Sequence, residues 1–377
     1  MVRHGIRDRL DARCRTDSWT SSRLIAKIFA TKMLSLLRRG KPIEERAHPE
    51  LPAELMMQIA SCLASDADRQ TLRMLNRQWK AAVDDSVIRM SGNMYTLHNK
   101  DLERLQAFKQ LQSLDLSQWK ALTDLAGLQC LPKLQSLELN CCTGLTAGAL
   151  RVLALLPRLR KLDLSCCAGL TDDCMEFITG VENLEWLSLQ GCKGLSAAGL
   201  SQLRQCKRLR YLDLSGTQVV SLGFLQLHSA SGKGQRMAGR VISIQADCSR
   251  NRAANVPSHS SEWRCSLRRL RLADCEGLAE SALCSLIGHA ELETLDLSRS
   301  TQALTGASVA ALQQLQGLRR LNLESSPEFC DSTLLELTLL QGLTHLDVSE
   351  CAELSPGAVS TLRHRMPATC AIYSATS

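Results

Sequence analysis

The seventeen cysteines are the residues best suited to chemistry in this 377-residue chain. So many thiols are commonly used either in metal sites or in disulfides. Zinc requires four ligands around one point, usually from closely spaced Cys-x2–4-Cys pairs. Here Cys141-Cys142, Cys166-Cys167 and Cys192 recur at a fixed interval, which would stack them in columns about 5 Å apart. We therefore expect small buried thiols, with no metal and no cofactor.

Motifs of catalysis and of nucleotide binding do not stand out in the sequence. It contains no His-Glu-x-x-His, no Gly-x-Ser-x-Gly and no phosphate-binding loop. The segment Ser231-Gly-Lys-Gly is only superficially similar to such a loop, because it lacks the Gly-Lys-Ser/Thr ending and a preceding strand. We therefore expect no enzyme activity and no catalytic residue.

The positive charge of the chain belongs to its first 46 residues. They contain twelve Lys or Arg and five acids, which accounts for the whole net charge of +7. We expect residues 1–46 to form a basic tail, either disordered or targeting, with a basic amphipathic helix over 21–39 as an alternative. No apolar run approaches the roughly 18 residues that suggest a membrane span, and no secretory signal is recognisable. This predicts a cytoplasmic or nuclear protein without a transmembrane segment or a nucleic-acid partner, with organelle targeting as the less favoured alternative.

A sequence repeat with a nearly constant period organises most of the chain. The motif Leu-x-Leu, with Val in the last copy, begins at positions 114, 137, 162, 187, 212, 270, 295, 321 and 346, so its spacing is even except for one long step from 212 to 270. Two apolar residues around one polar residue predict a short strand with one buried face. Turn residues follow, and then Ser or Thr at expected helix starts, such as Thr171, Ser196 and Ser355. Since no unit buries its own apolar side, the units must stack.

These repeats resemble the leucine-rich repeat family in its cysteine-containing subtype, which has a Cys five residues after the first strand Leu. That position holds Cys142, Cys167, Cys192, Cys275 and Cys351, whereas Trp119, Thr217, Ser300 and Ser326 depart from the pattern. The resemblance covers about residues 105–377. It implies an α/β solenoid, a horseshoe with parallel short strands on the concave face and helices on the convex face. We assign residues 93–377 to this domain.

The long step between the motifs at 212 and 270 has two interpretations. Residues 228–263 are rich in Ser, Gly and Arg with few apolar anchors, which favours a disordered insertion. Alternatively, Ile242-Ser-Ile244 forms a degenerate strand that divides the step into two repeats.

A helical segment precedes the repeats. Pro52 suits the first turn of a helix, and Leu55, Ile59 and Leu63 form an apolar stripe. The segment resembles an F-box, which begins Leu-Pro-x-Glu-Leu and closes with a basic step before a Trp; the matching residues are Leu51, Pro52, Glu54, Leu55, Ile59, Leu63, Arg77 and Trp79. It departs from the family at Leu75-Asn76, where Val-Cys is usual. It is also about one residue longer than the usual F-box. We place this segment at 47–92.

The F-box resemblance implies a partner. In that family the F-box binds the Skp adaptor of a cullin–RING ubiquitin ligase, and the repeats hold a protein substrate for proteasomal degradation. The adaptor contacts implied here are Leu51, Pro52, Leu55, Ile59, Leu63, Leu75 and Trp79. One alternative is that the segment only caps the repeats. The other is that the chain is a leucine-rich-repeat scaffold that does not bind the adaptor.

The concave face is the expected site of substrate binding. The residue between the two Leu of each motif points outward. These nine residues are Asp115, Glu138, Asp163, Ser188, Asp213, Arg271, Asp296, Asn322 and Asp347, and six of them are acidic. Trp186 and Tyr211 precede the first Leu of adjacent repeats and should lie side by side. Exposed aromatic residues are frequent binding anchors. We predict a site formed by Asp163, Trp186, Tyr211, Asp213 and Arg271 that favours a basic segment, the alternative being a solvated column of acids.

Overall fold

The computed structural model describes part of the chain, namely Met56, Ala60 and residues 77–91, 99–219, 221–225, 267–275, 277–300, 306–327 and 329–374. The chain divides into two units, one of residues 1–90 and 103–113, the other of residues 91–102 and 114–377. In the first unit, α5 (Arg77–Ser86) buries Ala82 and Val83. The predicted tail 1–46 and insertion 228–263 lie outside the described residues.

Eleven strands of three residues each form one sheet in chain order. They are β1 (Arg89–Ser91), β2 (Ser113–Asp115), β3 (Ser136–Glu138), β4 (Lys161–Asp163), β5 (Trp186–Ser188), β6 (Tyr211–Asp213), β7 (Arg269–Arg271), β8 (Thr294–Asp296), β9 (Arg320–Asn322), β10 (His345–Asp347) and β11 (Ala371–Tyr373). The pairing is parallel, and the central Leu of one strand lies opposite that of the next, as Leu162 lies opposite Leu187 and Leu212 opposite Leu270.

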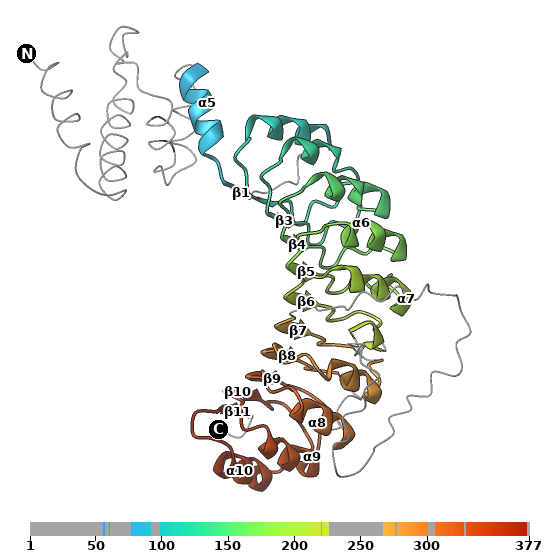
Figure 1. The fold of residues 1–377 in the computed structure, drawn as a ribbon, viewed down its shortest axis with the longest axis vertical. Coiled ribbons are helices and arrows are strands. Elements are labelled where there is room, and N and C mark those ends of the chain that lie inside the picture. Colours follow the sequence, from blue (N-terminus) through green and yellow to red (C-terminus); the bar gives the residue numbers. More distant parts are fainter. Residues whose placement is uncertain are drawn as a thin grey trace, which may run out of the picture. The chain divides into compact units, whose positions relative to one another are not determined.

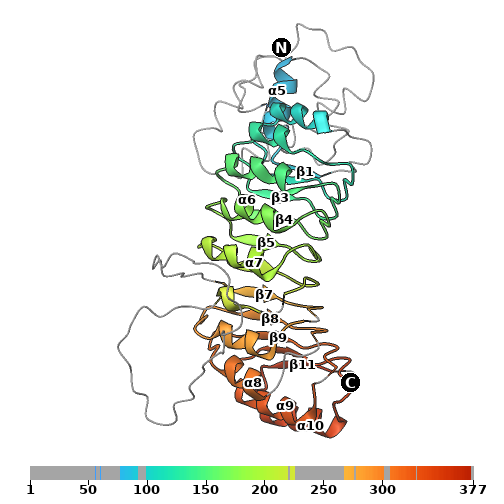
Figure 2. The same ribbon diagram turned by 90° about the vertical axis from the view of Figure 1, so that its right-hand side faces the viewer.

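Short helices connect the strands, many of them 3₁₀ helices labelled η. They are η1 (Asn99–Ala107), η2 (Ala126–Cys130), η3 (Ala147–Leu155), η4 (Asp172–Cys174), α6 (Met175–Thr179), α7 (Ala197–Leu200), η5 (Ser201–Gln205), η6 (Gly223–Leu225), η7 (Glu280–Leu286), α8 (Gly306–Gln313), α9 (Asp331–Glu336), η8 (Leu337–Leu339) and α10 (Pro356–Arg365). In the second unit the strands line one side and the helices the other (Figures 1 and 2).

The periodic leucines explain this arrangement. In each repeat the middle residue of the strand and the residue just after the strand are buried, as Leu162 and Leu164 show with no exposed area. Helix starts fall at the expected residues, since the Ser355 hydroxyl accepts a hydrogen bond from the Ala358 N–H (3.1 Å) and Pro356 is the first residue of α10. These observations confirm the predicted solenoid of parallel strands and helices.

The sheet continues across the long step between the motifs at 212 and 270. Strand β6 pairs directly with β7, and Tyr211 lies opposite Arg269, so the outward-facing residues of the two strands are neighbours. Among the described residues, no helix has the length and apolar character needed to cross a membrane.

Candidate functional site

The cysteines of the repeat form an interior column, at the position five residues after the first strand Leu. Each of these thiols donates a hydrogen bond of 3.1–3.4 Å to a strand-end carbonyl of the preceding repeat, the pairs being Cys142–Leu116, Cys167–Leu139, Cys192–Leu164, Cys275–Leu214 and Cys351–Leu323. Burial raises the pKa of the Cys192 thiol to about 12. The cysteine column therefore holds neutral thiols that link consecutive repeats.

The residues that depart from the cysteine pattern behave in three ways. Ser300 keeps the same bond, because its hydroxyl donates to the Leu272 carbonyl at 2.6 Å, while Thr217 donates within its own repeat, to Leu214. Ser326 Oγ and the Trp119 indole nitrogen are buried with no hydrogen-bond partner among the described residues. In the part of the chain that the structure describes, no three His, Cys, Asp or Glu gather as metal ligands would.

Two rows of side chains point outward from the strands on the concave face, because successive residues of a strand alternate between faces. The carboxylate row contains the third residue of each strand, and from β4 to β10 it runs Asp163, Ser188, Asp213, Arg271, Asp296, Asn322 and Asp347. The aromatic–arginine row contains the first residue, and over the same strands it runs Lys161, Trp186, Tyr211, Arg269, Thr294, Arg320 and His345.

The carboxylate row is bonded to the backbone where the strands end. The Asp163 carboxylate accepts a hydrogen bond from the Ser165 N–H at 3.0 Å. The carboxylates of Asp213, Asp296 and Asp347 likewise accept from the N–H two residues later in the chain. Such a bond satisfies an amide that leaves the strand ladder. These four aspartates are thus engaged by their own turns.

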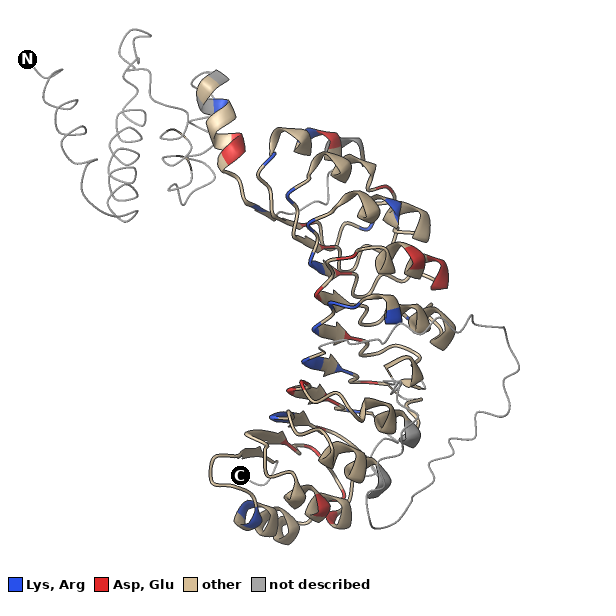
Figure 3. Cartoon of the chain, viewed as in Figure 1, with Lys and Arg blue, Asp and Glu red and all other residues tan. Residues whose placement is uncertain are grey.

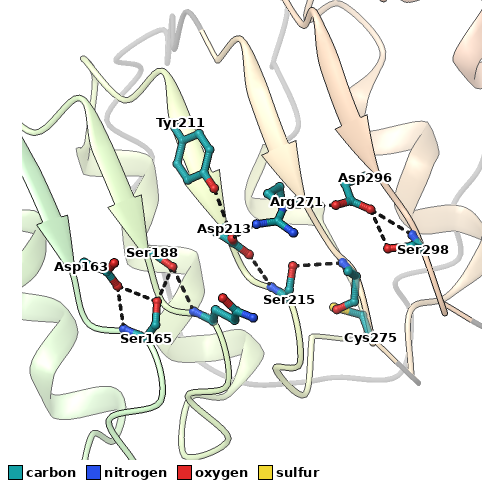
Figure 4. Close-up of polar contacts among 12 residues, drawn as sticks. Asp163, Ser165, Ser188, Tyr211, Asp213, Ser215, Arg271, Cys275, Asp296 and Ser298 are labelled. Atoms are coloured by element: carbon teal, nitrogen blue, oxygen red, sulfur yellow. Dashed lines mark hydrogen bonds and ion pairs between the residues drawn. The ribbon is translucent and has the colours of Figure 1, made fainter. Parts of the chain in front are cut away.

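Arg271 joins two of these carboxylates across three strands (Figure 4). Its guanidinium lies 3.1 Å from Asp213 Oδ2 and 3.1 Å from Asp296 Oδ2. The side chain of Asp213 is only 2% exposed, so its charge is balanced inside the protein. The Tyr211 hydroxyl donates to the same Asp213 oxygen at 3.2 Å. Burial, and then the Asp213 charge, raise the pKa of Tyr211, which keeps this donor protonated.

Trp186 and Tyr211 form the aromatic centre of the surface. Their rings are stacked, with centroids 4.6 Å apart and an interplanar angle of 9°. The Lys161 ammonium lies 4.8 Å from the centroid of the Trp186 ring and also pairs with Glu138 at 2.7 Å. Both rings are half-buried, so the pair is held in place before any partner binds.

A groove of about 710 Å³ lies where the strands β5 to β7 end, and Arg271 forms part of its wall. Every Leu-x-Leu motif is followed by a residue of positive φ, and only Gly191 and Gly216 are glycines at that position. Their missing side chains open the floor of the groove, and a Cβ at Gly191 would approach Cys166 Sγ to 3.1 Å. Lys193, Arg271 and Asp274 supply charge at the walls.

The structure brings most of the predicted substrate site together. Trp186, Tyr211, Asp213 and Arg271 lie on the adjacent strands β5, β6 and β7. Asp163 lies on β4, and its partner Ser165 contacts the Ser188 hydroxyl at 2.7 Å. The functional importance of this group stays a prediction.

The predicted adaptor-contact residues are almost entirely outside the described part of the chain. These are Leu51, Pro52, Leu55, Ile59, Leu63 and Leu75. Trp79 belongs to α5, which begins at Arg77.

Sequence reasoning missed the rest of the aromatic–arginine row and the groove. The same alternation that identified Asp213 also places Arg269 and Arg320 outward, since each is the first residue of its strand. The two glycines occupy equivalent places in consecutive repeats, where the other repeats carry a side chain. Both signals were present in the sequence.

Comparisons with known proteins show a likeness to solved structures only. No family model matches the chain, and no curated protein matches it. An internalin, InlF of Listeria monocytogenes, is similar over 81% of this chain and 86% of its own, at 14% identity and a TM-score of 0.44. Internalin C2 of the same organism is similar over 74% and 90%, at 17% identity and a TM-score of 0.40. A chain of the mouse RP105/MD-1 complex is similar over 74% and 41%, at 19% identity and a TM-score of 0.43.

The chain's own geometry establishes its fold. One sheet of eleven strands in chain order, central leucines in register and a thiol or hydroxyl linking successive turns all repeat with the sequence period. The described part of the chain therefore has the fold of a leucine-rich-repeat solenoid.

Proposed function

We propose that the chain is a receptor that binds another protein on the concave face of its repeats, centred on strands β5 to β7. The observation that carries this proposal is the stacked Trp186–Tyr211 pair, which stands beside the Arg271 ion pairs and the groove over Gly191 and Gly216. Large aromatic residues and arginines held in place dominate the energetics of many protein interfaces. Because stacking already restrains both rings, a partner loses less side-chain entropy on binding them.

We propose further that residues 51–79 attach this receptor to a Skp-type adaptor, and through it to a cullin–RING ubiquitin ligase. Support comes from the sequence resemblance of Leu51, Pro52, Leu55 and Ile59 to an F-box directly before cysteine-type repeats. The mechanism is proximity: a bound substrate has its lysines held at high effective concentration beside the ubiquitin-charged enzyme. The chain itself needs no catalytic residue for this role.

The repeat surface is tested by replacing both aromatic anchors. Full-length protein and the variant Trp186→Ala/Tyr211→Ala are used to capture partners, which quantitative mass spectrometry compares. Tyr373→Ala is the matched control, because Tyr373 is an exposed aromatic residue on the last strand β11. We expect the double variant to lose partners that the control keeps, with equal circular dichroism for all three. If the double variant captures the same partners as the unmodified protein, the proposal is wrong.

The adaptor arm is tested with purified Skp adaptor and the full chain. We expect a complex on gel filtration that the variant Leu51→Ala/Pro52→Ala/Ile59→Ala no longer forms. If the unmodified chain forms no complex, the chain is instead a leucine-rich-repeat scaffold independent of the ligase. The repeat surface keeps its role in that case.

A further inference from the structure

We infer that the protein segment bound by the aromatic–arginine row is acidic. This inference rests on the proposed function, because it names the chemistry of the partner for the same concave face. It reverses the expectation from sequence, which assumed that the outward carboxylates are free to attract a basic segment.

At its centre the carboxylate row is engaged in contacts within the protein. Asp213 and Asp296 share Arg271, and each also accepts a backbone N–H bond. Asp163 is engaged by the N–H and hydroxyl groups of Ser165. A cation from a partner would have to compete with Arg271 for the Asp213 and Asp296 carboxylates, and with Ser165 for that of Asp163.

The aromatic–arginine row differs in sign and in exposure. From β4 to β10 it contains no acidic residue. Arg269 and Arg320 are exposed, and neither makes an ion pair with another described residue. Figure 3 shows basic residues on the strands β7 and β9 that carry them. The neighbouring Arg160 and Arg268, one residue earlier in their repeats, are balanced by Glu185, Glu291 and Glu293.

The spacing of these arginines suits an extended segment. Arg269 lies directly beside Tyr211 in the sheet, and Arg320 follows two strands later, beyond Thr294. Two strand spacings amount to about 10 Å, which an extended chain covers in about three residues. A segment with carboxylates about three residues apart can therefore pair with both guanidinium groups while an apolar side chain contacts the half-buried aromatic pair.

The aromatic pair favours a protein over a single-stranded nucleic acid. Nucleic-acid platforms stack bases on open aromatic faces. Here Trp186 lies on β5 between Lys161 on β4 and Tyr211 on β6, and both of these contact its ring. Both faces of the indole are thus covered, so this ring offers no open face to a base.

The test measures fluorescence anisotropy of labelled oligoglutamate, oligolysine and oligothymidylate of equal length with the full-length chain at low ionic strength. We compare Arg269→Ser/Arg320→Ser with Lys207→Ser/Arg365→Ser, which removes two exposed charges near the connecting helices. We expect oligoglutamate to bind most tightly. We also expect the first variant to weaken it roughly three- to tenfold, as two exposed ion pairs would, and the control variant to leave it unchanged.

Three results would overturn the inference: tighter binding of oligolysine, tighter binding of oligothymidylate, or equal oligoglutamate affinity in the two variants. The last result would place the acidic probe elsewhere, for example on the basic residues before position 47. Failure here is distinct from failure of the proposed receptor function. If partners captured by the chain depend on Trp186 and Tyr211 but survive Arg269→Ser/Arg320→Ser, the receptor stands and its partner is not acidic.

Discussion

The interior cysteine column and the aromatic–arginine row cross the same repeats but carry different information. In the column, five thiols and the Ser300 hydroxyl make the same bond to the preceding repeat. In the row, almost every strand presents a different side chain, from Lys161 through Trp186 and Tyr211 to Arg320. A repeated bond holds the stack together, whereas an unrepeated surface distinguishes one partner from others.

The largest effect on stability is expected inside the strand, at Leu212. This side chain is fully buried and faces the equivalent leucines of two neighbouring strands. Leu212→Ala should lower the free energy of unfolding by about 3 kcal/mol or more, because it leaves a cavity between packed repeats. Urea unfolding measures this, with Leu339→Ala as the control, since Leu339 is 65% exposed. A similar loss in both variants would show that burial in the stack is not what matters.

The bond of the cysteine column can be tested with two serines at the same repeat position. Ser300 donates to the Leu272 carbonyl, whereas Ser326 Oγ is buried with no hydrogen-bond partner among the described residues. Ser300→Ala should lower the free energy of unfolding by about 1–2 kcal/mol, and Ser326→Ala should change it little or raise it. Equal losses in urea unfolding would mean that the hydroxyl stabilises the repeat by packing alone.

The stacked pair offers a smaller and more local effect. A double-mutant cycle of Trp186→Ala and Tyr211→Ala should give a coupling energy of about 1 kcal/mol, the usual value for an aromatic pair. The matched cycle of Trp186→Ala and Tyr373→Ala should give none, because Tyr373 on β11 lies six strands from Trp186 on β5. A coupling energy near zero for the first pair would show that the rings are not preorganised for a partner.

Much of the fold could be predicted from the sequence, because each structural feature recurs in several repeats. Leucines at the same place in successive repeats predicted strands whose central residues pair in register, as Leu162 and Leu187 do. The cysteine position was predicted to be a buried turn, and Cys192 is fully buried. The sequence pattern did not predict the hydrogen-bond acceptor of the Cys192 thiol, because that acceptor is the Leu164 carbonyl of the preceding repeat.

The candidate site was predictable only in part, because it depends on where the repetition breaks. Alternation within the strand placed Trp186 and Tyr211 side by side, and their rings are stacked. The same rule made Asp213 an outward residue, but the side chain of Arg271 comes from beyond the long step in the sequence and pairs with its carboxylate. This ion pair joins residues 58 positions apart in the sequence, and no local pattern indicates that their side chains meet.

The smallest expected effect is a difference in reactivity between a thiol of the cysteine column and a thiol outside it. No change in stability is expected. Hydrogen bonds from the hydroxyl groups of Ser332 and then Thr333 lower the pKa of Cys330 to about 7, whereas burial raises that of Cys192 to about 12. Because the thiolate is the nucleophile, iodoacetamide should label Cys330 at a rate that rises through about pH 7, while Cys192 stays unlabelled in the folded chain. Peptide mass spectrometry follows both sites, and Ser332→Ala should move the Cys330 profile to higher pH. Labelling of Cys192 at a comparable rate would show that the repeats open there. The cysteine column would then be as accessible to the reagent as a surface thiol.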